Sequence, residues 1–270
     1  MMRLLAFPSM VQIMLPATLA GYVLGVVLAT VGTVQRSRLA DRTASAVFLL
    51  TWVLHAVAIL FIGIEAGRIP LTNVFEYLVV FGWAVSGLYL YIAFRHRFRV
   101  AGLVLPPLAA LSIAGALAVS HPVVKDPDGL GVGFLFHTSI STLGMAFLGV
   151  AFGMALLYLA QDHALKSRSA PGLLQRLPAL EECDRVGFQA LIVGFVMLTV
   201  GIGTGIAMNT GRHSEFLSGG AKQIFPLLAW GVFLIVLFSR ARLGYRGRKS
   251  AYLTIAGFLL GLASVLGMAL

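Results

Sequence analysis

Charged residues are scarce in this sequence. Only 11% of the 270 residues are charged, whereas 59% are hydrophobic, and an average soluble domain has about 25% charged residues. This composition excludes an ordinary soluble globular protein. Hydrophobic runs of about 20 residues, the length that crosses a bilayer as a helix, recur along the whole chain. The sequence therefore predicts a polytopic membrane protein.

Cysteine and the common catalytic motifs are missing too. Cys183 is the only cysteine, so the sequence has no disulfide framework and no Cys-x-x-Cys-His motif of covalent haem attachment. A Walker motif, paired carboxylates and a Ser/His/Asp set are also absent, and the glycine run at 201–205 lacks the Lys-Ser/Thr of a phosphate loop. The chain is therefore not a c-type cytochrome, and nothing in it indicates a hydrolase or a pump.

The hydrophobic runs predict an all-α fold, a bundle of about eight transmembrane helices in one domain over residues 1–270. The expected spans are 10–33, 44–64, 74–94, 100–119, 135–160, 187–208, 223–239 and 251–269. Of the 20 Lys and Arg residues, 15 lie in the loops after the first, third, fifth and seventh spans. Because basic loops mark the cytoplasmic side, both termini are expected outside. The net charge of +10 thus reflects topology in a lipid bilayer and does not indicate a nucleic-acid partner.

His55 lies near the middle of the second expected span. An ionisable group at membrane depth is costly unless it is paired or functional. Trp52 lies three residues earlier, on the same helical face. Two interpretations remain open: a neutral histidine that donates a hydrogen bond to a neighbouring helix, or a ligand of a metal or a haem iron. The first span, 10–33, is interpreted as scaffold.

A short polar segment, residues 65–73, joins the second and third spans on the expected outer face. The sequence Asn73-x-x-Glu76 fits a capping box, and the helix dipole favours a glutamate in a first turn. A purely structural role and a functional role of Glu76 both remain open.

Further candidate ligand-binding residues lie toward the outer face. His137 is near the start of the fifth span, at a surface where a haem-sized ligand could enter; the alternative is an interfacial histidine in contact with lipid headgroups and water. The loop after the sixth span adds cationic and aromatic groups, namely Arg212, His213, Phe216 and Lys222. An iron porphyrin needs an axial imidazole, an apolar slot and cationic or donor groups for its propionates.

Together these motifs resemble the cytochrome c assembly family, a group of membrane haem-handling proteins that includes the CcsA, CcmC and HemX types. The similar residues are Trp52-x-x-His55, Gly67-x-x-Pro70-Leu71-x-Asn73-x-x-Glu76 and Trp83, followed by His137, Lys222 and Trp230. In the family, a histidine at the position of His137 is an axial haem ligand. The resemblance covers nearly the whole chain from residue 44.

The sequence departs from the family in its haem loop. The family pattern is the tryptophan-rich WGxxWxWD, whereas residues 212–220 contain neither tryptophan nor aspartate, and Phe216 offers the one aromatic face. An inner histidine of the family is replaced by Phe238, and no histidine follows the last expected span. These departures make the chain most similar to the HemX-type branch.

The resemblance implies an integral membrane protein of the bacterial cytoplasmic membrane that binds or relays haem in cytochrome c maturation, rather than a stand-alone catalyst. Haem is then a transiently held cofactor, with His137 and His55 as iron ligands, and a second membrane subunit is a candidate partner. Two alternatives remain. One is a HemX-type regulatory or scaffolding subunit that affects haem biosynthesis through the expected cytoplasmic loop 161–185, without haem transfer. The other is a small-molecule transporter.

Overall fold

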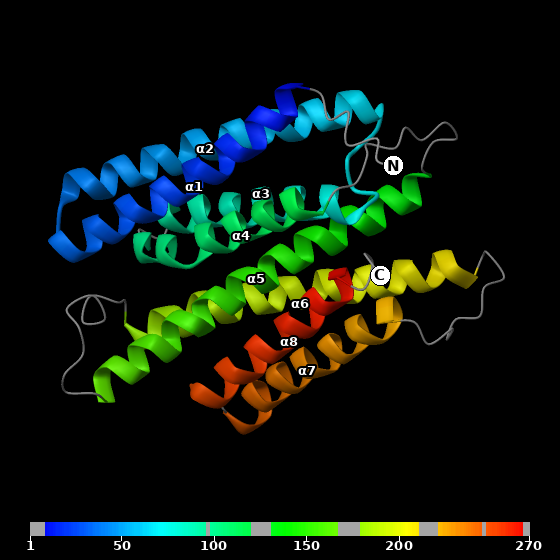
Figure 1. The fold of residues 1–270 in the computed structure, drawn as a ribbon. Helices are drawn as coiled ribbons and strands as arrows, with labels where there is room; N and C mark the ends of the chain where they lie inside the picture. The colour runs from blue at the N-terminus through cyan, green and yellow to red at the C-terminus, as the bar shows by residue number, and fades with distance from the viewer. Residues whose placement is uncertain are drawn as a thin grey trace. The chain divides into compact units, whose positions relative to one another are not determined.

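The computed structural model describes residues 9–95, 98–119, 131–166, 179–210, 221–244 and 247–266, and Figure 1 shows these ranges as an all-helical structure. The helices are α1 (Ser9–Gln35), α2 (Arg38–Ala66), α3 (Val74–Arg95), the 3₁₀ helix η1 (Arg99–Leu103), α4 (Leu105–Ala118), α5 (Val132–Lys166), α6 (Leu180–Thr210), α7 (Ala221–Leu243) and α8 (Arg248–Leu266). No strand occurs in these ranges.

Seven stretches of the described chain are long and apolar enough to cross a membrane. They comprise α1 to α3, η1 with α4, and α5 to α7. The eighth helix, α8, begins with Arg248 and Lys249 and is apolar beyond them. The prediction of an all-helical, polytopic bundle with about eight helices is confirmed, whereas the outward orientation of both termini stays a prediction.

The helices extend beyond the apolar runs at the expected cytoplasmic side. The sequence predicts a loop over 161–185, but α5 continues to Lys166 and α6 already begins at Leu180. The extension of α5 carries an ion pair between Lys166 and Asp162, one helical turn apart. Glu181 and Glu182 occupy the first turn of α6, where the helix dipole favours negative charge. Hydropathy therefore marks where the chain crosses lipid and not where each helix ends.

By its contacts, the chain divides into two compact units, Met1–Leu135 and Phe136–Leu270. The first unit contains α1 to α4, and the second contains α6 to α8 with almost all of α5. The prediction of a single domain over residues 1–270 stays a prediction.

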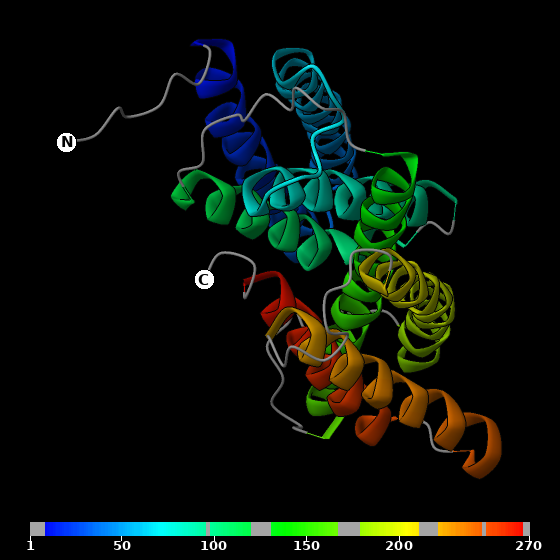
Figure 2. The same cartoon turned by 90° about the vertical axis from the view of Figure 1, so that its right-hand side faces the viewer.

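In the first unit, α1 packs along α2 and α3 packs along α4, as Figures 1 and 2 both show. The largest fully buried side chains come from all four helices and include Tyr22, Phe48, Phe75, Leu105 and Ile113. This core fixes the positions of α1, α2 and α3, which carry the first group of candidate site residues.

In the second unit, small residues bring α5 close to α6. A Cβ atom at Gly144 would lie 2.8 Å from the Cβ of Met197, and one at Gly194 would lie 2.8 Å from the Cγ of Leu148. Close helix approach through small residues is typical of membrane bundles. It places His137 of α5 directly beside the glycine run of α6.

Candidate functional site

The polar segment between α2 and α3 begins at Gly67. Gly67 adopts a left-handed conformation with φ of 67°, which costs a glycine little because it has no Cβ. The N–H of Gly67 donates to the carbonyl of Ile64, and the N–H of Arg68 donates to the carbonyl of Gly63. This pair of bonds is the Schellman arrangement that ends many helices, and it turns the chain so that Arg68 faces α3.

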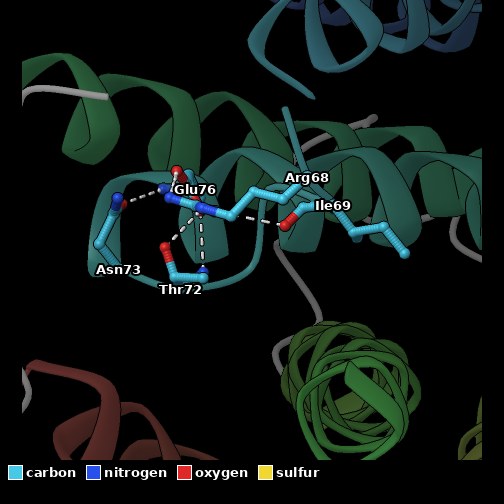
Figure 3. Close-up of polar contacts among 5 residues, drawn as sticks. All are labelled: Arg68, Ile69, Thr72, Asn73 and Glu76. Atoms are coloured by element: carbon cyan, nitrogen blue, oxygen red, sulfur yellow. Dashed lines mark hydrogen bonds and ion pairs between the residues drawn. The ribbon is translucent and has the colours of Figure 1, made fainter. Parts of the chain in front are cut away.

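A buried ion pair holds this segment, as Figure 3 shows. Glu76 is fully buried, and its two carboxylate oxygens accept hydrogen bonds from the two terminal nitrogens of Arg68 at 2.8 and 3.0 Å. The oxygen Oε2 also accepts from the backbone N–H of Thr72 at 2.8 Å and from its hydroxyl at 3.0 Å. Charge-assisted, bidentate pairs of this kind are among the stronger hydrogen bonds in proteins.

Asn73 supplies half of the expected capping box. Its Oδ1 accepts the N–H of Glu76 at 2.8 Å, as an N-cap side chain does. In the reciprocal bond of a capping box the N–H of Asn73 would donate to the Glu76 carboxylate, but the carboxylate instead accepts from Thr72 and Arg68. Of the two roles left open for Glu76, this geometry supports the structural one: it joins the end of α2 to the start of α3.

His55 lies in the core of the first unit. Its side chain is fully buried, and its Nδ1 is 3.0 Å from the hydroxyl of Tyr22 in α1. That hydroxyl is in turn 2.7 Å from the Oγ of Ser86 in α3. The bundle therefore contains a buried polar chain that ties three helices together. The scaffold interpretation of the first span missed Tyr22, which contributes the central member of this chain.

The protons of this chain can be arranged in two ways. If Ser86 donates to the carbonyl of Trp83, which is 3.0 Å away, then Tyr22 donates to Ser86 and the proton of His55 lies on Nδ1. If Ser86 donates to Tyr22 instead, Tyr22 donates to Nδ1 and the proton lies on Nε2, near the backbone of Val79. In both arrangements Nε2 is buried and makes no hydrogen bond of standard geometry to a described residue.

Trp52, about one helical turn before His55, joins α2 to α3. Its ring stacks on that of Trp83 with a centroid distance of 5.2 Å and an interplanar angle of 11°. Its Nε1 donates to the Trp83 carbonyl at 3.2 Å, the same oxygen that Ser86 approaches. Trp52 and His55 thus share one helical face, as expected, and both bind neighbouring helices.

His137 lies in a different environment, on the surface of α5 that faces α6. Its side chain is about half-buried. Its Nδ1 is 2.9 Å from the carbonyl of Gly201 and 3.1 Å from the hydroxyl of Thr204. Because a carbonyl can only accept, Nδ1 carries the proton and Nε2 carries the lone pair. Among the described residues, no hydrogen bond is made to Nε2.

The remaining predicted site residues are less fully described. Arg212, His213 and Phe216 lie outside the described residues. Lys222 lies in the first turn of α7, and its side chain is outside the description. His55 belongs to the first unit and His137 to the second.

A pocket occurs in the second unit. It has about 340 Å³ of empty space, part of it open to solvent, and lies among α5, α6, α7 and α8. One wall is the ion pair of Arg240 with Asp184, whose two bonds are both 2.6 Å long, and the guanidinium of Arg240 also covers the ring of Phe188. His137 does not line this pocket.

Sequence comparisons give one consistent result. A family model described as "Cytochrome C assembly protein" matches residues 12–270. The chain is 27% identical over 256 residues to "Cytochrome c biogenesis protein CcsA" of Microcystis aeruginosa (strain NIES-843 / IAM M-2473), covering 76% of this chain and 77% of that protein. It is 26% identical over 239 residues to "Protein HemX" of Brevibacillus brevis, covering 86% of each.

Proposed function

Since this multi-pass membrane chain belongs to the cytochrome c assembly protein family, we propose that it binds or relays haem during cytochrome c maturation. The membrane proposed is the bacterial cytoplasmic membrane, and two of the similar proteins come from bacteria. The names of these relatives support a role in cytochrome c biogenesis or a HemX-type role. The identity of the group that is carried rests on the chemistry of His137.

The observation that supports haem binding most directly is the hydrogen bond from His137 to α6. Histidines that bind metals usually donate their other ring N–H to a carbonyl or carboxylate, which fixes the tautomer and the ring orientation. In His137 the Nδ1–H donates to the Gly201 carbonyl, so the lone pair of Nε2 is available to an iron atom. The donor set therefore fits an axial ligand, and a bound haem would supply the iron and the apolar macrocycle.

The other predicted residues have supporting roles in this proposal. Arg212, His213 and Lys222 would neutralise the haem propionates, and Phe216 would stack on the macrocycle. His55 is the second candidate iron ligand, because its Nε2 has no hydrogen bond among the described residues. Its side chain is fully buried, so iron would reach it only if the helices of the first unit separated, and His137 is therefore the main proposed ligand. A partner membrane subunit is the proposed source of a further ligand.

The test is the amount of haem that copurifies with variants of two histidines on one helix. His137→Ala removes the proposed ligand, whereas His163→Ala removes an exposed histidine near the end of α5. We expect the first variant to lose at least about tenfold in haem affinity, the lower end of the range for loss of even an outer-shell group. The second should retain the haem content of the unmodified protein. Equal haem content in both variants would contradict the proposal.

A HemX-type regulatory or scaffolding role is the second candidate function. The similarity to the HemX protein, which covers 86% of both chains, favours it. In that case the purified protein would contain no haem above background. Shortening the segment between α5 and α6 would then change the cellular level of haem-biosynthesis enzymes, which the haem-binding proposal does not require.

A further inference from the structure

The glycine run of α6, residues 201–205, has no assigned role in the sequence patterns. Gly201, Thr204 and Gly205 are spaced by three and four residues, so they lie on one face of α6. Contacts from α5 meet this face: His137 lies against Thr204 and Gly205, and Ser141, one turn further along α5, lies against Gly201. Gly203 lies elsewhere on the helix, and a Cβ atom there would meet nothing within 4 Å.

Gly205 makes room for the imidazole ring. A Cβ atom at this position would lie 3.0 Å from Cε1 of His137, 3.6 Å from Nδ1 and 3.7 Å from Nε2. The ring therefore approaches the backbone of α6 with the edge that contains Cε1, and a methyl group would push it away. Gly201 makes room for Ser141 in the next turn of α5, because a Cβ atom at Gly201 would lie 2.6 Å from the Oγ of Ser141.

Thr204 and Gly201 together determine which nitrogen carries the proton. The hydroxyl of Thr204 has one proton, which it donates within its own helix to the carbonyl of Val200 or of Gly201, both 2.9 Å away. Its oxygen is then an acceptor toward His137. The Nδ1 atom of His137 thus faces two acceptors, the carbonyl oxygen of Gly201 and the hydroxyl oxygen of Thr204. Both oxygens would repel a lone pair on Nδ1, so the proton is favoured there.

We propose that Gly201, Thr204 and Gly205 form a positioning face for His137, which holds the imidazole as the Nδ1–H tautomer and so leaves the lone pair on Nε2. The effect on iron binding rests on the proposed haem function, whereas the tautomer is a property of the protein without haem. The partner of Nδ1–H is a neutral carbonyl and not a carboxylate. Since a carboxylate partner makes a histidine ligand more basic, a carbonyl suits a ligand that must release its cargo.

The inference is tested first on the protein without added haem. In protein labelled with ¹⁵N-histidine, protonated and unprotonated ring nitrogens have separate chemical shifts, and the His137 signals are those lost in His137→Ala. We expect Nδ1 to be protonated and Nε2 unprotonated. Gly205→Ala should displace the ring and move the population toward the Nε2–H tautomer that free histidine favours in water. Gly203→Ala, the matched control two residues earlier, should leave the signals unchanged.

The second readout is haem affinity, measured by titration of the detergent-solubilised protein. Second-shell changes typically cost 10- to 100-fold in metal affinity, so we expect about a tenfold loss in Gly205→Ala. Thr204→Val, which removes one of the two acceptors, should lose a few-fold, and Thr204→Ser should restore the affinity. Gly203→Ala should stay within about twofold of the unmodified protein.

The two proposals fail in different ways. An Nε2–H tautomer in the unmodified protein, or equal effects of Gly205→Ala and Gly203→Ala, would overturn the positioning face even if haem binds through His137. A protein that binds no haem would overturn the proposed function, and the ¹⁵N signals would still decide whether α6 fixes the tautomer.

Discussion

His55 and His137 have similar hydrogen bonds and very different access. Each has a bonded Nδ1, and in neither does Nε2 bond a described residue. His55, however, is sealed within the first unit and bonded to a tyrosine, whereas His137 is partly exposed and bonded to a backbone carbonyl. Under the proposed function, one of these histidines is structural and the other binds a ligand, with nearly the same hydrogen bonds. Access to Nε2 separates the two roles.

The first unit depends on buried polar contacts in two places, the ion pair of Arg68 with Glu76 and the chain from His55 through Tyr22 to Ser86. Buried polar groups are stable only while their partners are present. Substitutions in the first unit should therefore lower stability, and substitutions near His137 should change ligand binding.

The largest effect on stability is expected from Glu76. Glu76→Ala leaves the guanidinium of Arg68, which is 9% exposed, without its counter-charge, and breaking a buried pair costs about 3–5 kcal/mol. We expect a large loss of thermal stability in detergent, measured by the unfolding midpoint. Glu65→Gln, a matched change at the end of α2, should cost much less. The combined variant Arg68→Met/Glu76→Met should recover part of the lost thermal stability. A Glu76→Ala protein as stable as the unmodified one would refute the structural role of Glu76.

The next largest effect is expected from the His55 chain. Tyr22→Phe removes the hydroxyl that bonds both His55 and Ser86, and an unsatisfied buried group costs about 1–3 kcal/mol. Haem bound per folded molecule should stay the same. His137→Ala should show the reverse pattern, with lost haem and little change in stability. If Tyr22→Phe removed haem without lowering stability, the proposed contrast between a structural His55 and a ligand-binding His137 would be wrong.

Two ion pairs at the expected cytoplasmic end of the second unit differ in burial, and loss of the exposed one should have the smallest effect. Asp184→Asn breaks a bidentate pair with Arg240, whose side chain is 10% exposed, and bonds to charged groups contribute about 1.5–3 kcal/mol. Arg185→Gln breaks a pair with Glu182 on the solvent side, where the contribution is about 0–1 kcal/mol. Chemical denaturation of both variants measures the difference. Haem content should be unchanged in both, since neither residue touches His137.

The sequence was sufficient to predict the membrane helices and the residue that caps the start of α3. Apolar runs located the membrane helices, and Asn73 was expected as a cap because capping depends on residues three apart. The partners of the buried groups were not predictable in this way. Tyr22 and Ser86 are separated by 64 positions, and their contact depends on how three helices pack. Tyr22, the only tyrosine of α1, was the one available signal.

The His137 environment was predictable only in part. Its position near the start of the fifth span followed from the hydropathy pattern, but its acceptor is a backbone carbonyl, which every residue possesses. The glycine run of α6 was visible in the sequence, yet its role depends on which turn of α5 lies against it. Packing between the two helices decides which of their turns face each other, and the local sequence pattern does not reveal this.

The most direct measurement is the Soret absorbance per folded molecule in the unmodified protein, His55→Ala and His137→Ala, purified under the same conditions. We predict a haem band in the unmodified protein, a similar band per folded molecule in His55→Ala, and loss of the band in His137→Ala. A band that survives in His137→Ala and disappears in His55→Ala would show that the sealed histidine binds the iron, and would contradict the assignment made from access.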